Sequence, residues 1–311
     1  MSSEQDVQPG DASALTAFSV VVPVFNEEQG LQITLEALRA ALQASGRTHE
    51  IIVVDDGSTD STPQILARFA GVAIVRHEAN RGYGAALKTG IRAAHHPLIV
   101  LIDADGTYPV APIPGLLDRC ASADMVVGAR IGANVHATPA RNVAKWCFRQ
   151  FAQWITGATI VDLNSGLRVF HRRVAEQFMG LFPDGFSFTT TITVASLIER
   201  LAVRFEPVDY LPRIGRSKLR PLRDTLRIAR QLLWLGLRLA PLRTLAAALF
   251  PLLAVGVGSA AFHLNDTGRV TTGDVAALLA VTIGLGIGMF AEQRVRRRRW
   301  ASVRILASAG K

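Results

Sequence analysis

The amino-acid sequence predicts an α/β protein whose mainly parallel sheet is followed by an amphipathic interface helix and two C-terminal transmembrane helices. Three observations support this fold class. Short apolar runs alternate with helical patterns between residues 18 and 129, which is typical of a parallel sheet covered by helices. A basic helical pattern follows residue 220, and two long uncharged stretches follow residue 244.

The strands expected in the sheet are short, continuous and rich in Val and Ile, as strands buried on both faces should be. Helical patterns lie between them and would cover both faces. We expect strands at Phe18–Val24, Ile51–Val54, Val72–Val75, Leu98–Ile102 and Met125–Gly128, and helices at Leu31–Ser45, Thr62–Phe69, Gly84–Ala94 and Ile113–Cys120.

The pattern is less regular after residue 131, and we place the end of the α/β domain at residue 220 and its start at residue 17. Helices are expected at Arg141–Thr156 and Thr189–Leu201, and strands at Leu167–Phe170 and Arg204–Tyr210. Residues 1–16 are polar and acidic without an apolar core, so we expect a disordered tail and no signal peptide.

The net charge of +9 is unevenly distributed: residues 1–212 carry −4 and residues 213–311 carry +13. Residues 221–243 combine a basic and an apolar helical stripe, as in a helix that lies in a membrane interface. A surface helix with solvated charges is the alternative. The basic stripe contains Arg220, Arg223, Arg227 and Arg230, and the apolar stripe contains Leu222, Leu226, Ala229 and Leu233.

Two stretches without a formal charge, Leu245–Leu264 and Val275–Ala291, fall in or near the length range of membrane spans. Basic segments flank both, and the positive-inside rule then places both flanks in the cytoplasm. We therefore expect a transmembrane hairpin at residues 244–292 and a basic cytoplasmic tail at residues 293–311, in the inner (plasma) membrane. Two buried core helices are the weaker alternative.

The motif that carries most chemical information is Asp103-Ala104-Asp105, which follows the apolar run ending at Ile102. Open α/β sheets bind ligands at the carboxyl ends of their strands. Carboxylate oxygens there suit Mg²⁺ or Mn²⁺, and such ions share their coordination with substrate phosphates. We therefore predict Asp103 and Asp105 as metal ligands.

Polar loops after the first two predicted strands should emerge at the same edge of the sheet. The first contains Glu27, and the second contains Asp55 and Asp56, whose carboxylates suit a base or ribose. The second loop also has the composition of a turn with an N-cap. Glycines in Asn80–Lys88 would let a phosphate approach the start of the next helix, although this signal is weak.

The motifs resemble those of the family 2 inverting glycosyltransferases with the GT-A fold. Within that family the chain looks most similar to the polyprenyl-phosphate sugar synthases of the dolichyl-phosphate mannose synthase group. The resemblance covers residues 18–220 and rests on V-P-V-F-N-E, V-V-D-D-G-S-T-D, N-R-G-Y-G-A-A-L, D-A-D-G-T-Y-P, G-A-R and N-S-G-L-R-V-F, in this order.

The resemblance implies roles for individual residues. Thr107 stands where relatives often have Gln as a further metal ligand. The basic loop after the last predicted strand resembles the R-x-G-x-S-K loop of the family. The implied catalytic residues are Asp105, Arg130, Arg213 and Lys218, and the implied nucleotide-sugar-binding residues are Pro23, Phe25, Glu27, Asp55, Asp56, Asp103, Ala104 and Arg141.

The resemblance implies a membrane-anchored enzyme that uses Mg²⁺ or Mn²⁺ to transfer one sugar from a nucleotide-diphosphate sugar to a polyprenyl phosphate. A phosphate acceptor is already an anion. The alternative acceptor, a hydroxyl of a lipid-linked glycan or polymer, needs a general base, for which Asp162 is the candidate.

A non-catalytic scaffold conflicts with the intact acidic motif. Nucleic-acid binding is disfavoured because the basic residues lack interleaved aromatics. The sequence identifies neither the sugar nor the base of the donor, and it does not decide whether the protein forms a homo-oligomer.

Overall fold

The structure is a computed structural model that describes residues 17–131, 139–215 and 221–309. The predicted tail at residues 1–16 lies outside this range. The chain forms two compact units. The first combines the chain up to Val143 with Ile160–Ile228, and the second combines Ala144–Thr159 with the chain from Ala229 onward. Most of helix α5 (Pro139–Thr156) therefore belongs to the second unit.

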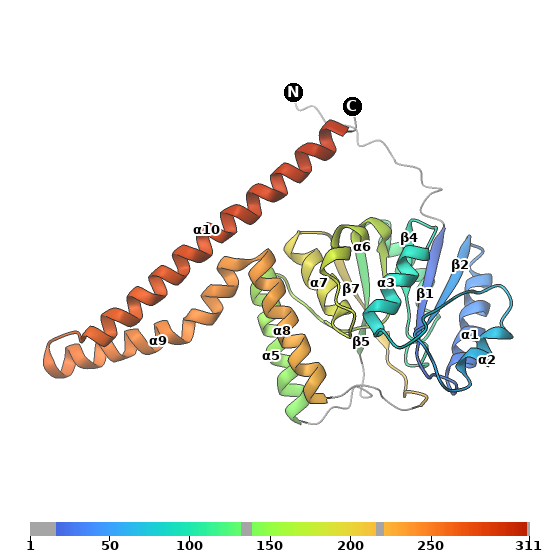
Figure 1. The fold of residues 1–311 in the computed structure, drawn as a ribbon, viewed down its shortest axis with the longest axis horizontal. Helices are drawn as coiled ribbons and strands as arrows, with labels where there is room; N and C mark the ends of the chain where they lie inside the picture. The colour runs from blue at the N-terminus through green and yellow to red at the C-terminus, as the bar shows by residue number, and fades with distance from the viewer. Residues whose placement is uncertain (1–16, 132–138, 216–220, 310–311) are drawn as a thin grey trace. The chain divides into compact units, whose positions relative to one another are not determined.

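The first unit is built on a seven-stranded sheet with the order β3-β2-β1-β4-β6-β5-β7 (Figure 1). All neighbouring strands are parallel except β6, which runs antiparallel to β4 and β5. The mainly parallel sheet predicted from the sequence is thus confirmed. The strands are β1 (Phe18–Val24), β2 (His49–Asp55), β3 (Ala73–Arg76), β4 (Leu98–Leu101), β5 (Met125–Ile131), β6 (Arg168–His171) and β7 (Val203–Asp209).

Helices cover both faces of this sheet. Alternate residues of β1 point to opposite faces, so Val20 and Val22 join a core cluster with side chains of α1, α2 and α4. Val21 points to the other face, where Gly90 allows α3 to approach closely. The short helix α6 and the 3₁₀ turn after it were not predicted. The helices are α1 (Leu31–Ala44), α2 (Thr62–Ala67), α3 (Tyr83–Ala93), α4 (Ile113–Cys120), α6 (Arg172–Phe178) and α7 (Phe188–Ile198).

The antiparallel strand β6 has a consequence for the position of the loops. Leu101, the last residue of β4, pairs with Arg168, the first residue of β6. The loop before β6 therefore lies at the edge of the sheet where β1, β2, β3, β4, β5 and β7 end. Segments from distant parts of the chain share this edge.

Helix α8 (Pro221–Leu239) has an apolar surface that the protein leaves uncovered. Leu232 and Leu235 are buried, whereas Leu226 is 67% exposed and Leu233 46% exposed. The exposed leucines belong to the stripe predicted for an interface helix. Trp234 is also exposed, and the guanidinium of Arg238 lies 5.2 Å from the centre of its ring.

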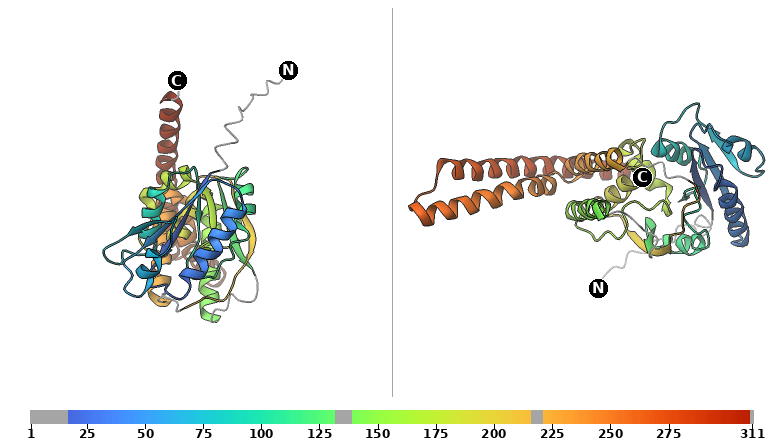
Figure 2. Two further views of the ribbon diagram at one scale, coloured as in Figure 1. Left: turned by 90° about the vertical axis from the view of Figure 1, so that its right-hand side faces the viewer. Right: turned by 90° about the horizontal axis from the view of Figure 1, so that it is seen from below.

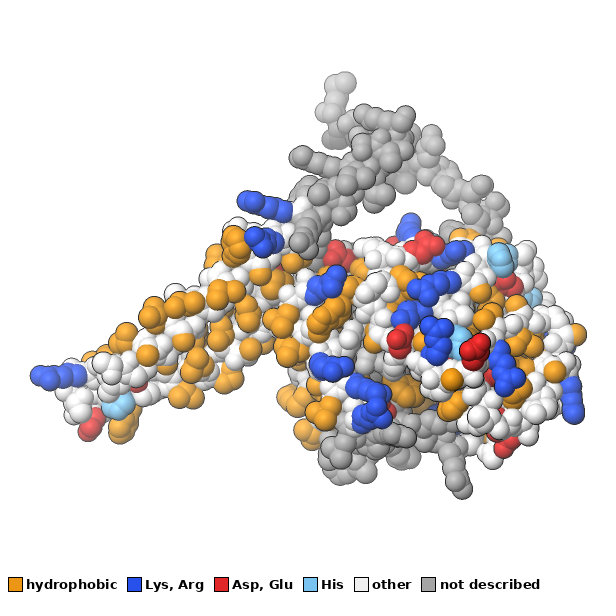
Figure 3. Space-filling view, in the orientation of Figure 1, with side chains coloured by type: hydrophobic (Ala, Val, Ile, Leu, Met, Phe, Trp, Pro, Cys, Tyr) orange, Lys and Arg blue, Asp and Glu red, His pale blue; other side chains and the backbone are white. Residues whose placement is uncertain are grey.

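The second unit ends in a helical hairpin of α9 (Pro241–Thr267) and α10 (Thr272–Ala309), which lie side by side (Figures 1 and 2). Helix α9 and residues Thr272–Val295 of α10 are long and apolar enough to span a membrane, and each contains an 18-residue window with a mean hydropathy of 2.0. Only 6% and 17% of these windows are buried. Hydrophobic side chains cover the hairpin along its length (Figure 3).

Candidate functional site

The acidic pair lies directly beyond β4, and each carboxylate receives a hydrogen bond from one hydroxyl. The hydroxyl of Tyr83 donates to Oδ1 of Asp103 at 2.8 Å. The hydroxyl and the amide of Thr107 donate to Oδ1 of Asp105 at 2.6 and 3.1 Å. On its other side Asp103 lies against Gly166, where a Cβ would overlap its carboxylate. Both acidic side chains are therefore held in place by their neighbours.

The electrostatics of this pair fit a divalent cation. Desolvation, followed by repulsion from the carboxylate of Asp105, raises the pKa of Asp103 to about 7. A bound cation would remove this repulsion, and carboxylate oxygens are ligands that Mg²⁺ and Mn²⁺ accept. Within the described residues no group of three or more His, Cys, Asp or Glu side chains is arranged to hold a metal. The remaining ligands would come from diphosphate oxygens and water.

Arg213 lies between the acidic pair and the loop after β1. Its guanidinium is 3.0 Å from Oδ2 of Asp105 and donates to Oε1 of Glu27 at 2.6 Å. Two backbone hydrogen bonds attach the same segment to the acidic motif, from Leu211 to the carbonyl of Thr107 and from Ile214 to the carbonyl of Asp105. The segment after β7 and the loop after β4 are thus joined into one structure.

Arg130, near the end of β5, forms a bidentate ion pair with Asp162. Its Nε and a terminal nitrogen donate to the two carboxylate oxygens at 2.7 and 2.8 Å, and its guanidinium lies 5.3 Å from the ring centre of Tyr210. Although desolvation opposes it, hydrogen bonding to Arg130 lowers the pKa of Asp162. An ionised carboxylate with a lowered pKa is a weak proton acceptor.

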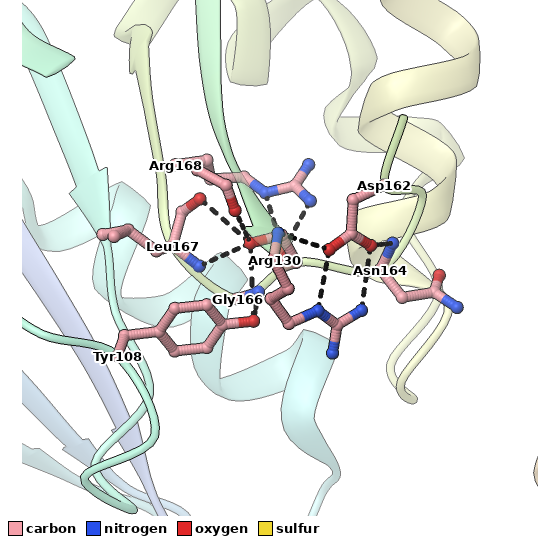
Figure 4. A network of polar contacts seen from close by, with 9 residues as sticks. Tyr108, Arg130, Asp162, Asn164, Gly166, Leu167 and Arg168 are labelled. Carbon is pink, nitrogen blue, oxygen red and sulfur yellow. Dashed lines mark hydrogen bonds and ion pairs between the residues drawn. The ribbon is translucent and has the colours of Figure 1, made fainter. Parts of the chain in front are cut away.

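A buried polar network supports this part of the site (Figure 4). The hydroxyl of Ser165 donates to the carbonyl of Gly128 at 2.6 Å, and the amide of Gly166 donates to the hydroxyl of Tyr108 at 2.7 Å. The guanidinium of Arg168 donates to the carbonyl of Ser165. It also donates, at 3.1 Å each, to the carbonyl of Thr189 and the hydroxyl of Thr193 in α7. The N-S-G-L-R motif therefore builds the wall beside Asp103.

The two acids after β2 have different surroundings. Asp55 is fully buried; its Oδ1 accepts the amide of Ser58, while its Oδ2 lacks a hydrogen bond and lies 3.3 Å from Nε of Arg76. Asp56 accepts hydrogen bonds from His77 and from the amides of Arg81 and Gly82. Asp55 is thus buried beside Arg76, whereas Asp56 holds the loop before α3 in place.

The glycines at the start of α3 allow close packing of chain against chain. Gly82 has φ +105°, and a Cβ there would overlap the carbonyl of Asp184. A Cβ on Gly84 would overlap the carbonyl of Pro183, and the amide of Ala85 donates to Asp184. The amides of Arg81, Gly82 and Ala85 are therefore used within the protein.

Three further residues predicted to bind the nucleotide sugar, Pro23, Phe25 and Ala104, lie in or after β1 and after β4. Pro23 is buried in β1 beside Val54, Phe25 is half-exposed in the loop that follows, and Ala104 is buried with its carbonyl accepting the Thr34 hydroxyl at 3.2 Å. Arg141 lies in the first turns of α5, but the position of its side chain is not described. Lys218 lies outside the described residues.

Sequence reasoning missed the parts played by Tyr83 and Arg168. Both lie inside motifs that were recognised, N-R-G-Y-G and N-S-G-L-R. An aromatic residue between two glycines and an arginine in an otherwise apolar strand are unusual enough to draw attention. Neither pattern, however, identifies a partner 20 or more residues away, such as Asp103 for Tyr83.

Comparison with protein families identifies the first unit. The model of Glycosyl transferase family 2 matches residues 19–179, which include β1 to β6 and the acidic pair.

Curated relatives include three that the chain matches at 31 to 35% identity. A low-salt glycan biosynthesis hexosyltransferase of Haloferax volcanii is 31% identical over 75% of this chain and 55% of the relative. A dolichyl-phosphate hexose transferase of the same organism is 32% identical over 65% and 86%. An undecaprenyl-phosphate 4-deoxy-4-formamido-L-arabinose transferase of Pseudomonas paraeruginosa is 35% identical over 52% and 49%. The chain thus spans only about half the length of the first and third.

Solved structures share the fold. Glucosyl-3-phosphoglycerate synthase from Mycobacterium tuberculosis, in complex with Mn²⁺, UDP-glucose and phosphoglyceric acid, superposes with a TM-score of 0.56 at 21% identity, over 74% of this chain and 85% of that chain. The same enzyme with Mg²⁺ and UDP gives the same TM-score, identity and coverage. At this identity the similarity establishes the GT-A fold alone.

Proposed function

The chain belongs to glycosyl transferase family 2, and from this premise we propose that it transfers a single sugar from a nucleotide-diphosphate donor to a polyprenyl phosphate, with inversion at the anomeric carbon. Relatives named dolichyl-phosphate hexose transferase and undecaprenyl-phosphate 4-deoxy-4-formamido-L-arabinose transferase support a lipid monophosphate as acceptor.

The observation that carries this proposal is the state of Asp162. It is the candidate general base for a hydroxyl acceptor, yet both of its oxygens are occupied by Arg130 and its pKa is lowered. A sugar hydroxyl would lack a base there, whereas a phosphate acceptor is ionised at neutral pH and needs cations in place of a base. Arg130, near the end of β5, and Arg213, in the segment after β7, supply two guanidinium groups at this edge of the sheet.

The chemistry of the transfer follows from these charges. An oxygen of the lipid phosphate attacks the anomeric carbon, and the bond from that carbon to the nucleoside diphosphate breaks with its electron pair on the diphosphate. Asp103 and Asp105 would hold Mg²⁺ or Mn²⁺, which when bound neutralises charge on the leaving diphosphate. Arg213 and Arg130 would grip phosphate oxygens, because a guanidinium offers a fork of donors to such groups.

Membrane anchoring belongs to the same proposal. The uncovered stripe of α8 and the apolar hairpin of α9 and α10 support attachment to the inner membrane as a multi-pass protein. Basic flanks on both sides of the hairpin support a cytoplasmic position for the catalytic unit. A lipid phosphate at the interface would then lie on the same side as soluble nucleotide sugars.

The experiment that tests the proposal is a donor screen with the full-length enzyme in detergent. UDP- and GDP-sugars are offered with undecaprenyl phosphate and Mn²⁺, and the lipid product is analysed by mass spectrometry. We expect one donor to add one hexose or modified sugar to the lipid phosphate. Transfer to glycan hydroxyls with an inert lipid phosphate would refute the proposal.

Two variants separate the acceptor classes. Arg213→Ala should raise the KM for polyprenyl phosphate or lower kcat, with a smaller effect on nucleotide-sugar affinity. Asp162→Asn should lower kcat by less than about 10-fold, because loss of a general base typically costs about 10²–10⁴-fold. Loss of turnover in a folded, nucleotide-binding Asp162→Asn protein, with a mild Arg213→Ala effect, would favour the hydroxyl acceptor.

A further inference from the structure

We propose that Tyr83 is a positioning residue that orients the Asp103 carboxylate for the divalent cation. The inference rests on the proposed function, because it assumes that Asp103 is a metal ligand. Its starting point is the 2.8 Å hydrogen bond from the Tyr83 hydroxyl to Oδ1 of Asp103. Hydrogen-bond donors behind metal-binding carboxylates commonly orient them.

The Tyr83 ring is held from several sides. Tyr83 is the first residue of α3, and its ring stacks on Phe186 with centroids 5.6 Å apart and planes inclined by 19°. Before it, Asp56 accepts the amides of Arg81 and Gly82. After it, the amide of Ala85 donates to the carbonyl of Asp184. The position of the hydroxyl is therefore set by the fold and does not depend on a ligand.

The Asp103 carboxylate is confined between this hydroxyl and the backbone of the loop before β6. Its Oδ1 faces Tyr83, and its carboxylate lies so close to Gly166 that a Cβ there would overlap it. Removing the hydroxyl would let the carboxylate rotate about its last torsion. The second acid of the pair has an equivalent partner in Thr107, so each predicted ligand has its own hydroxyl donor.

Tyr83 acts as a hydrogen-bond donor, and its partner is Oδ1 of Asp103. Among the three tyrosines of the chain, Tyr108 instead accepts a backbone amide and Tyr210 presents its ring to Arg130.

The test measures Mn²⁺ affinity on the full-length protein in detergent, from the electron paramagnetic resonance signal of free Mn²⁺, alone and with UDP or GDP. Tyr83→Phe keeps the ring and its stack on Phe186 but removes the hydroxyl. We expect its Kd for Mn²⁺ to rise by about 10-fold or more. The matched control, Tyr210→Phe, should bind Mn²⁺ as the wild type does.

Kinetics give a second readout that a general loss of stability would not produce. In Tyr83→Phe the KM for Mn²⁺ should rise, and kcat should recover at saturating Mn²⁺. If Tyr83→Phe does not fold, Phe186→Ala decides, since it removes the ring that supports Tyr83 and keeps the hydroxyl. Weaker Mn²⁺ binding in that variant supports the inference, and unchanged binding overturns it.

The possible failures are distinguishable. Wild-type Mn²⁺ affinity in a folded Tyr83→Phe protein would overturn the role of Tyr83 alone. Equal Mn²⁺ affinity of the wild type and Asp103→Asn would instead show that the metal assignment in the proposed function is wrong. Equal weakening by Tyr83→Phe and Tyr210→Phe would mean that loss of any tyrosine hydroxyl loosens the site, and would also overturn the inference.

Discussion

At the scale of single residues, Arg168 has the most unusual surroundings in the first unit. It is fully buried, and its guanidinium donates hydrogen bonds to neutral oxygens of Ser165, Thr189 and Thr193. Burial lowers its pKa. A buried charge is costly unless its donors are satisfied and opposite charges are near. The acids of the site, Asp103 and Asp162, attract it electrostatically, so the site and its wall stabilise each other.

We predict that Arg168→Met destabilises the protein by about 1–3 kcal/mol, because it removes both guanidinium donors from the buried carbonyl of Ser165 and an unsatisfied buried group costs about that much. The measurement is thermal or denaturant unfolding of the full-length protein in detergent. A midpoint within error of the wild type would contradict this account of the network.

The pKa of Asp103 predicts a pH dependence. Its folded value of about 7 lies above the unfolded value of about 4. In the metal-free protein its contribution to stability is therefore fully present below about pH 4 and lost as the pH rises through about 7. Mn²⁺ competes with the proton for this carboxylate, so Mn²⁺ should raise the Tm more at about pH 8 than at about pH 6. An equal shift at both pH values would contradict the assignment.

At the scale of elements, the sequence predicted what depends on local pattern and missed what depends on pairing. Strand β4, within the apolar run Leu98–Ile102, and the helix with the leucine stripe, α8, could be predicted, because an apolar run and a helical period appear within the sequence of the element itself. That β6 runs antiparallel between β4 and β5 is not visible, since strand order depends on long-range contacts. For the same reason Asp162 and Arg130 were each named as site residues, but the ion pair between them was not predicted.

The start of α3 gives a prediction at this scale. Gly82→Ala should destabilise the protein by more than about 2 kcal/mol, since it adds left-handed strain of about 1–3 kcal/mol and an overlap with the carbonyl of Asp184. Gly46→Ala is the matched control: Gly46 has φ +64° and no atom within 4 Å of the added Cβ. Its loss of stability should be about 1 kcal/mol. Equal effects of the two variants would show that the overlap is relieved without cost.

At the scale of the whole molecule, the proposed membrane-spanning hairpin predicts on which side of the membrane each segment lies. We predict that a cysteine at Asp266, in the last turn of α9, reacts with a membrane-impermeant maleimide added outside intact cells, whereas a cysteine at Arg223 in α8 reacts only after permeabilisation. Cys120 and Cys147 are replaced first. Labelling of both positions from the same side would contradict a membrane-spanning hairpin.

The strand order also determines when the catalytic unit becomes complete during synthesis. Strand β5 pairs only with β6 and β7 in the sheet, and both follow it in the chain. On the ribosome β5 must therefore wait, without a strand partner, until the segment ending at Asp209 has emerged. Helix α9 starts at Pro241, shortly afterwards. For a hairpin that inserts into a membrane as proposed, closure of the sheet and insertion would then follow each other closely during synthesis.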